Sequence, residues 1–183
     1  ALDIGTGTGA IALSLVQEGP FRRVVATDAS EPALELAREN ARRTGLADAV
    51  ELRAGRVWEP VAAGERFDAV VSNPPYVAES ERETLPPEVR EWEPAEALFA
   101  ADRGLRVLDE IVAGAGAHLE PGGLLALEVG LGQAREVAAR IEAAGGYEEV
   151  RVQRDLADRE RIVLARREET ESNEHPDETE GDG

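Results

Sequence analysis

The chain has 183 residues, enough for one domain with a sizeable hydrophobic core, and the absence of cysteine excludes disulfides and thiolate metal sites. Its formal charge is −18, and so acidic a protein repels a phosphate backbone, so we expect no direct binding to nucleic acid. No apolar run is long enough to span a membrane and no secretion signal is visible, which predicts a cytoplasmic protein. The two histidines, His118 and His175, are predicted to be surface residues, and no metal site is expected.

Strand and helix patterns alternate along the chain, which predicts an α/β fold with a doubly wound sheet. The predicted elements are, in chain order, a strand at 1–4, a helix at 10–17, a strand at 24–26, a helix from Ser30 to Gly45, strands at 50–53 and 69–72, a helix at 105–118, a strand at 124–128, a helix at 133–144 and an antiparallel pair at 150–153 and 162–165. Pro121-Gly122-Gly123 is predicted to be a turn.

Two segments do not follow this alternation. Residues 77–100 are polar and marked by prolines, and so long a stretch within a compact domain is usually functional or disordered. Residues 168–183 carry eight acids and no base, which predicts a disordered acidic tail after a domain at 1–167. The chain opens in a strand-like segment without an initiating methionine, which we interpret as a missing beginning.

A glycine-rich segment joins the first strand to the first helix, and it consists of Gly5, Thr6, Gly7, Thr8 and Gly9. Glycine lets the backbone approach a ligand closely, and a helix N-terminus favours polar or anionic groups. The motif by itself also fits a dinucleotide site or a purely structural turn.

Three further residues are candidates for cofactor binding. Asp3 lies two residues before Gly5, where a carboxylate would repel a pyrophosphate but suit the ammonium group of S-adenosylmethionine. Asp28 ends the second strand and could accept hydrogen bonds from both ribose hydroxyls, although it could also cap the following helix. Trp58 could line an adenine pocket, or it could simply pack in the core.

The residues Asn73, Pro74, Pro75 and Tyr76 follow the fourth predicted strand and are the candidate catalytic and substrate-binding motif. The Asn73 side-chain carbonyl and the Pro74 carbonyl could accept hydrogen bonds from the N–H groups of a planar nitrogen. These bonds would orient the nitrogen and localise its lone pair toward a methyl donor, while Tyr76 stacks beside it. Together with the glycine turn, the motif predicts an S-adenosylmethionine-dependent N-methyltransferase that needs no metal.

The segments Asp-x-Gly-Thr-Gly-Thr-Gly-Ala and Val-Ser-Asn-Pro-Pro-Tyr-Val resemble the HemK/PrmC family of release-factor glutamine (N5) methyltransferases. The similarity continues at 89–94 (Val-Arg-Glu-Trp-Glu-Pro), at 102–105 (Asp-Arg-Gly-Leu) and from Asp155 to Arg161. The resemblance implies a seven-stranded, class I, Rossmann-like methyltransferase sheet with an antiparallel edge strand.

The resemblance also implies a substrate, namely the glutamine of the Gly-Gly-Gln loop of class 1 peptide chain release factors. It assigns Gly5–Gly9, Asp28, Trp58 and Asn73 to S-adenosyl-L-methionine, and the Asn73–Tyr76 motif to the glutamine. The family carries an N-terminal helical domain that this sequence lacks, and we expect a monomer.

Other functions remain open at this point. Adenine-N6 and guanine-N2 nucleic-acid methyltransferases use similar Asn/Asp-Pro-Pro-aromatic loops, but they must bind phosphates. A non-catalytic partner with the same fold would have no need of Asp3, Asp28 or the Asn73 motif. A nicotinamide-dependent oxidoreductase would likewise give Asp3 and the Asn73 motif no role.

Overall fold

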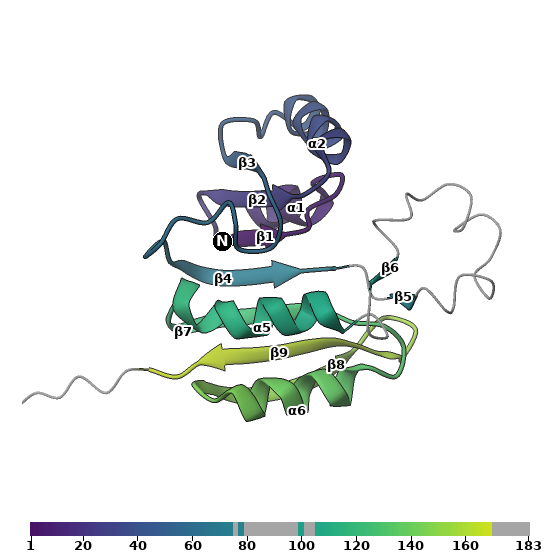
Figure 1. The fold of residues 1–183 in the computed structure, drawn as a ribbon. Coiled ribbons are helices and arrows are strands. Elements are labelled where there is room, and N and C mark those ends of the chain that lie inside the picture. Colours follow the sequence, from purple (N-terminus) through teal and green to yellow (C-terminus); the bar gives the residue numbers. More distant parts are fainter. Residues whose placement is uncertain (75–76, 79–98, 101–104, 170–183) are drawn as a thin grey trace, which may run out of the picture.

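The computed structural model describes residues 1–74, 77–78, 99–100 and 105–169, and its centre is a seven-stranded sheet (Figure 1). The strands lie in the order β3-β2-β1-β4-β7-β9-β8. Their bounds are β1 (Leu2–Ile4), β2 (Val24–Asp28), β3 (Val50–Ala54), β4 (Phe67–Ser72), β7 (Leu119–Glu128), β8 (Tyr147–Arg154) and β9 (Glu160–Arg167). The short strands β5 (Val77–Ala78) and β6 (Phe99–Ala100) pair separately.

The direction of the strands defines one functional edge of the sheet. Strands β3, β2, β1, β4 and β7 are mutually parallel, whereas β9 runs antiparallel to both β7 and β8. The chain winds outward from β1 to β3 and then returns to β4 on the other side of β1, so the connection reverses between β1 and β4. In open α/β sheets, ligands bind beyond the carboxyl ends of the strands at this switch point. We call this edge of the sheet the carboxyl edge.

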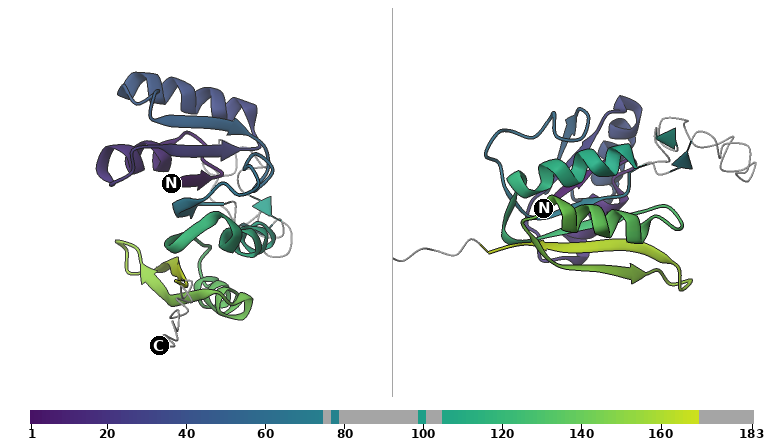
Figure 2. Two further views of the ribbon diagram at one scale, coloured as in Figure 1. Left: turned by 90° about the vertical axis from the view of Figure 1, so that its left-hand side faces the viewer. Right: turned by 60° about the horizontal axis from the view of Figure 1, so that its bottom comes forward.

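Helices cover both faces of the sheet (Figure 2). The bounds of the helices are α1 (Ala10–Glu18), α2 (Glu31–Thr44), α5 (Arg106–His118) and α6 (Ala134–Ala144). One cluster of buried apolar residues joins α5 and α6 to the sheet, and a second joins α1 and α2 to the opposite face. Side chains alternate between the faces, so Leu2 and Ile4 enter the first cluster while Asp3 between them lies on the α1 face.

The fold confirms the doubly wound α/β sheet expected from the sequence, including antiparallel pairing at one end. Helix α2 shows why its limits were predictable. The Ser30 hydroxyl accepts a hydrogen bond from the N–H of Ala33, Pro32 lies in the first turn, and Gly45 ends the helix with φ at 74°.

Two local predictions were wrong. Pro121-Gly122-Gly123 lies within β7 rather than before it. Leu119 pairs with Phe67 and Leu124 pairs with Ala69, so five residues of β7 advance as far as two residues of β4. The extra residues are absorbed as an irregularity of the strand, with Gly122 at φ 72°. His118 is half-buried rather than a free surface residue, because its ring stacks on Trp58.

Some predictions lie outside the described residues. These are His175, most of the 77–100 segment, the matches at 89–94 and 102–104, and the acidic segment from 170 onward. Within the described ranges, no helix combines the length and the apolar character that crossing a bilayer requires.

Candidate active site

The register of the sheet brings the predicted motifs to one level at the carboxyl edge. Ile4 pairs with Thr27 on β2 and with Ser72 on β4, so the next residues, Gly5, Asp28 and Asn73, follow side by side. Adjacent strands lie about 4.8 Å apart, so the three positions fall within two strand spacings. Segments separated by up to about seventy residues in the chain are therefore brought together by backbone pairing alone.

The glycine turn is formed by backbone conformations that favour glycine. Gly5, Gly7 and Gly9 have φ angles of 70°, 55° and 82°, in the left-handed region. The N–H groups of Gly5 and Thr6 both donate to the carbonyl of Thr27, at 2.8 and 2.9 Å, which fastens the turn to the end of β2. A Cβ on Gly5 or Gly7 would meet no atom within 4 Å, so the outer surface of the turn is open to a ligand.

Asp3 lies beneath this turn and is fully buried. Its Oδ2 accepts hydrogen bonds from the Thr6 hydroxyl at 2.6 Å and from the N–H of Ala12, in α1, at 3.1 Å. Its Oδ1 is buried and has no hydrogen-bond partner in the described part of the chain. Burial raises the pKa of Asp3 to about 6, against the lowering effect of the bonds from Thr6 and Ala12.

Asp28 connects the turn to helix α2. Its Oδ2 accepts a hydrogen bond from the N–H of Gly7, and its Oδ1 accepts one from the N–H of Ser30, both at 2.8 Å. The carboxylate is half-buried, and each oxygen has a further lone pair that can accept a hydroxyl. Asp28 organises the start of α2 and still reaches the carboxyl edge, so its structural role is compatible with the predicted ribose contact, which stays a prediction.

Asn73 is the first residue after β4, and its side chain is exposed at the carboxyl edge. Its neighbours are fixed, because the Ser72 hydroxyl donates a buried 2.7 Å hydrogen bond to the carbonyl of Ile4 and Pro74 is buried. This places an exposed amide on a strand end whose flanking residues are buried. Pro75 and Tyr76 lie outside the described residues.

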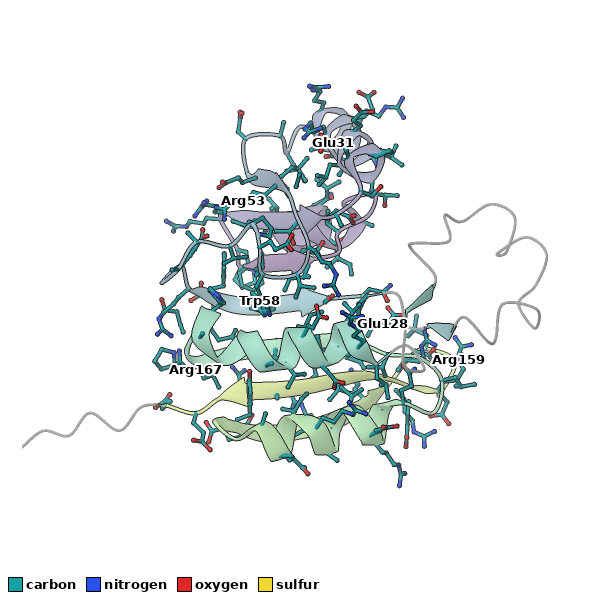
Figure 3. The ribbon with its side chains drawn as sticks, viewed as in Figure 1. Glu31, Arg53, Trp58, Glu128, Arg159 and Arg167 are labelled. Carbon is teal, nitrogen blue, oxygen red and sulfur yellow. The ribbon has the colours of Figure 1, made fainter. Side chains whose placement is uncertain are left out.

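Trp58 is directed at helix α5 (Figure 3). Its indole N–H donates to the carbonyl of Glu110 at 2.9 Å, and its ring stacks on His118 with centroids 4.8 Å apart. Its ring also lies so close to Gly114 that a Cβ there would stand 2.2 Å from the indole nitrogen. These contacts favour the packing interpretation of Trp58, and its contact with the cofactor stays a prediction.

Glu128 was not selected as a functional residue from the sequence, yet the register places it beside Asn73. Ser72 pairs with Leu127, so Glu128 is the residue level with Asn73 on the neighbouring strand β7. The Oε1 atom of Glu128 accepts a 2.9 Å hydrogen bond from Arg161 at the start of β9. The Arg161 side chain is only 16% exposed. The sequence did contain a signal for Glu128, because this acid ends an apolar strand as Asp28 does.

No group of three or more acidic or histidine side chains that could hold a metal ion occurs among the described residues.

Comparison with known proteins defines the class. Residues 1–86 match the family described as Methyltransferase small domain. Similar folds include a methyltransferase from Pyrococcus furiosus (TM-score 0.68, 23% identity, 92% of this chain and 74% of that one) and a ribosomal protein L11 methylase from Lactobacillus delbrueckii (TM-score 0.66, 17% identity, 91% and 69%). The fold is that of the Rossmann-like, S-adenosylmethionine-dependent methyltransferases.

Sequence relatives are found among the release factor glutamine methyltransferases. A release factor glutamine methyltransferase from Cereibacter sphaeroides is 48% identical over 165 residues, and one from Moorella thermoacetica is 46% identical over 167. These alignments cover 90% and 91% of this chain but 58% of the length of each relative. By sequence the chain is similar to the release factor glutamine methyltransferases over about nine tenths of its length, which agrees with the resemblance found in its motifs.

Proposed function

We propose that this chain transfers a methyl group from S-adenosyl-L-methionine to the side-chain amide nitrogen of the glutamine in the Gly-Gly-Gln motif of class 1 release factors. The proposal rests mainly on one observation: Gly5, Asp28 and Asn73 follow directly after paired residues of three adjacent strands and so lie side by side at the carboxyl edge. In this proposal residues 1–167 form the catalytic domain and 168–183 an acidic tail. The enzyme acts as a cytoplasmic monomer without direct contact to nucleic acid.

The residues at the carboxyl edge fit the methyl donor. The buried, unpartnered Oδ1 of Asp3 suits an ammonium group, which would supply the missing hydrogen bonds. The carboxylate of Asp28 suits a ribose diol, and the open surface of Gly5 and Gly7 admits a ligand against the backbone. Thr6 and Thr8 are the other residues of this turn. The side-chain amide of Asn40 donates a 2.9 Å hydrogen bond to the backbone carbonyl of Thr8.

The proposed transfer depends mainly on orientation. S-adenosylmethionine supplies an electrophilic methyl group on a sulfonium sulfur. The glutamine nitrogen forms the new bond to carbon as the carbon–sulfur bond breaks, and one amide proton then leaves to water. Holding two reactants in line can contribute about 7–11 kcal/mol to lowering a barrier.

In this mechanism Asn73 and Pro74 position the amide, since the Asn73 side-chain carbonyl and the Pro74 carbonyl accept its two N–H groups. Pro75 and Tyr76 are proposed to contact the same glutamine. Because Ser72 and Pro74 are buried on either side of Asn73, the acceptor stands on a backbone that cannot shift easily.

Cofactor binding tests the first half of the proposal. We expect saturable binding of S-adenosylmethionine by calorimetry, and a loss of at least about tenfold in affinity for Asp28→Ala, which removes the ribose acceptor. Asp28→Ala also releases the N–H groups of Gly7 and Ser30. The matched control is therefore Ser30→Ala, which disturbs the cap of α2 but leaves the Asp28 carboxylate in place. Equal binding by both variants would contradict the role of Asp28.

A further inference from the structure

Two exposed leucines lie at the carboxyl edge. Among the described residues, the exposed large hydrophobic side chains are Leu36 and Leu131, which are 47% and 73% exposed, and Leu156, which is fully exposed. Leu36 is on α2. Leu131 lies in the loop between β7 and α6, and Leu156 lies in the turn between β8 and β9.

The topology places both of these loops on the same edge as Asn73. Strand β7 ends at Glu128, level with Asn73, and the loop that carries Leu131 continues from there. Strand β8 is parallel to β7, because β9 is antiparallel to both, so β8 also ends at the carboxyl edge. In Figure 3, Glu128 and Arg159 mark this end of the molecule, and Arg159 belongs to the same turn as Leu156.

The two loops start close together. The N–H of Val129 donates to the carbonyl of Arg161 at 2.9 Å, which joins the end of β7 to the start of β9. Leu131 lies two residues beyond Val129, a path of at most about 7 Å, and Leu156 lies five residues before Arg161, at most about 18 Å. One protein surface can therefore contact both leucines and the Asn73 position.

Neither leucine is needed to shape its loop. The β8–β9 turn is closed by the Asp155 carboxylate, whose Oδ1 accepts bonds from the N–H groups of Ala157 and Arg159 at 2.8 and 3.0 Å. In the other loop the N–H of Gly130 donates to the Gln133 side chain at 2.7 Å. Both leucine side chains therefore expose apolar surface that their loops do not require, and both lie on the edge of the sheet that holds the proposed site.

Charge at this edge further restricts the partner. Four arginines in or beside the two loops are paired, in the ion pairs Arg154–Asp158, Arg159–Asp155, Arg135–Glu160 and Arg161–Glu128. These four pairs are neutral, while the chain as a whole carries −18. Long-range attraction then favours a partner with a basic surface, and local adhesion must come from the leucines.

We propose that Leu131 and Leu156 form an apolar docking surface for the protein that presents the target glutamine, a basic domain with apolar residues flanking its glutamine loop. This inference rests on the proposed function, because it names the surface by which the substrate of that same site is recognised. A free glutamine offers no apolar surface to the two leucines, so the docking surface favours a larger substrate that presents apolar residues beside its glutamine.

The test is the double variant Leu131→Ser/Leu156→Ser, compared with Leu36→Ser on α2 as a matched control. With a purified class 1 release factor, we expect the KM of the double variant to rise at least about tenfold, since burial of each leucine contributes to affinity. We expect an unchanged kcat at saturation, unchanged affinity for S-adenosylmethionine and an unchanged Tm. Leu36→Ser should match the wild-type chain in all four quantities, and added salt should weaken binding of the release factor.

The outcomes separate the two proposals. If the wild-type chain methylates the release factor and the double variant does so with the same KM, the docking surface is wrong while the function stands. If KM rises equally for Leu36→Ser, the effect is not specific to the carboxyl edge and the inference is also wrong. If the wild-type chain neither methylates nor binds the release factor, the proposed function fails and the docking surface fails with it.

Discussion

Asp3 is a buried acid that serves the fold and the proposed site at once. Its Oδ2 joins the turn at Thr6 to helix α1 at Ala12, while its Oδ1 has no partner among the described residues. Burial raises the pKa of Asp3 to about 6 from an ordinary value of 3.8. Ionisation of the Asp3 carboxyl at neutral pH therefore lowers the stability of the fold. A buried acid with a raised pKa is typical of binding and catalytic sites.

This cost gives a pH-dependent prediction for Asp3→Asn. A raised pKa in the folded state favours folding at low pH, and that contribution is lost as pH rises from about 4 through about 6. An asparagine keeps an oxygen for Thr6 and Ala12 but does not ionise. Relative to the wild-type chain, we expect the free energy of unfolding of Asp3→Asn to increase by up to about 3 kcal/mol between pH 4 and pH 8.

Urea denaturation at a series of pH values measures this difference. The exposed residue Asp48 offers a control, since Asp48→Asn should follow the wild-type curve throughout. A constant difference between Asp3→Asn and the wild-type chain across the pH range would show that the Asp3 carboxyl does not titrate abnormally.

The glycine turn illustrates how one element combines packing with ligand access. Gly9 packs against helix α2, where an added Cβ would stand 3.2 Å from the Cβ of Ala37. Gly7 has the same left-handed conformation, but nothing lies within 4 Å of the position of its missing Cβ. Two glycines of one motif are therefore required for different reasons.

We predict that Gly9→Ala and Gly7→Ala separate stability from binding. Gly9→Ala should lower the free energy of unfolding by about 2–3 kcal/mol, from backbone strain and crowding against Ala37. Gly7→Ala should lose only about 1 kcal/mol, yet weaken binding of S-adenosylmethionine, because its methyl group occupies the open surface of the turn. Denaturation and calorimetry measure both quantities.

Gly45→Ala is the control for these variants, since Gly45 has φ at 74° and open space but ends α2 away from the turn. It should cost stability and leave cofactor binding intact. Equal cofactor affinity for Gly7→Ala and Gly45→Ala would contradict the proposed position of the ligand.

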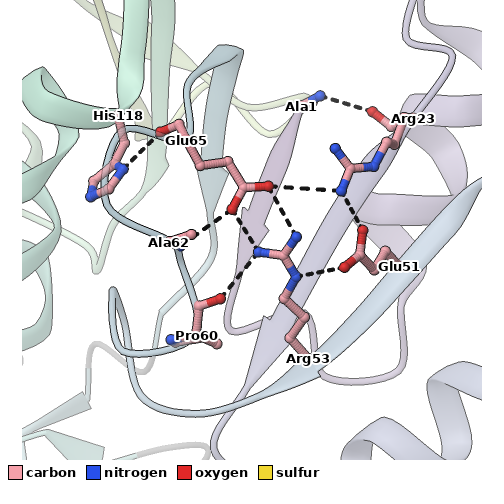
Figure 4. Close-up of polar contacts among 8 residues, drawn as sticks. All are labelled: Ala1, Arg23, Glu51, Arg53, Pro60, Ala62, Glu65 and His118. Atoms are coloured by element: carbon pink, nitrogen blue, oxygen red, sulfur yellow. Dashed lines mark hydrogen bonds and ion pairs between the residues drawn. The ribbon is translucent and has the colours of Figure 1, made fainter.

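A polar network links Arg23, just before β2, to β3 and to the loop before β4 (Figure 4). Arg53 of β3 binds the Glu65 carboxylate through two hydrogen bonds, at 2.7 and 3.0 Å, and also donates to the carbonyl of Pro60 at 3.1 Å. The Glu65 carbonyl contacts the His118 ring at 2.9 Å, which ties this loop to the end of α5. Arg53 holds the pKa of Glu65 below its usual value.

Glu65→Gln should therefore destabilise the fold by about 1–2 kcal/mol at pH 7, as expected for a paired, partly buried charge. Since the pKa of Glu65 is lowered in the folded protein, this contribution is present above the ordinary pKa of the group and is lost as pH falls. Thermal unfolding at pH 7 and pH 3 measures the loss.

Glu31→Gln removes the exposed pair with Arg38, whose side chains are 58% and 40% accessible, and should change stability by less than about 0.5 kcal/mol. If the two variants were equally stable at pH 7, the Glu65 network would add nothing to the fold.

For the molecule as a whole, the sequence predicted the order of elements and the two motifs, because both depend on local patterns. Ser30, Pro32 and Gly45 defined α2 through its caps, and the strands were visible as apolar runs. The adjacency of Asn73 and Glu128 could not be predicted, because it depends on the register between β4 and β7. The place of Trp58 could not be predicted either, since it follows from how α5 packs on the sheet.

The exposed positions of Leu131 and Leu156 are likewise properties of the assembled fold. In the sequence each is one leucine in a loop, and only the parallel direction of β7 and β8 brings both loops to the carboxyl edge. The grouping of loops at the carboxyl edge therefore depends on the topology of the sheet. The chemistry of the individual motifs can be predicted from the residues alone.

The central claim is that Asn73 holds a glutamine amide for methyl transfer. Its most direct test is to incubate the chain with S-adenosylmethionine and a purified class 1 release factor, and to map the added mass by peptide mass spectrometry. We predict one methyl group, on the glutamine of the Gly-Gly-Gln motif, with the rate at saturating S-adenosylmethionine reduced at least about a thousandfold in Asn73→Ala. A methyl group at another residue, or equal rates for Asn73→Ala and the wild-type chain, would contradict it.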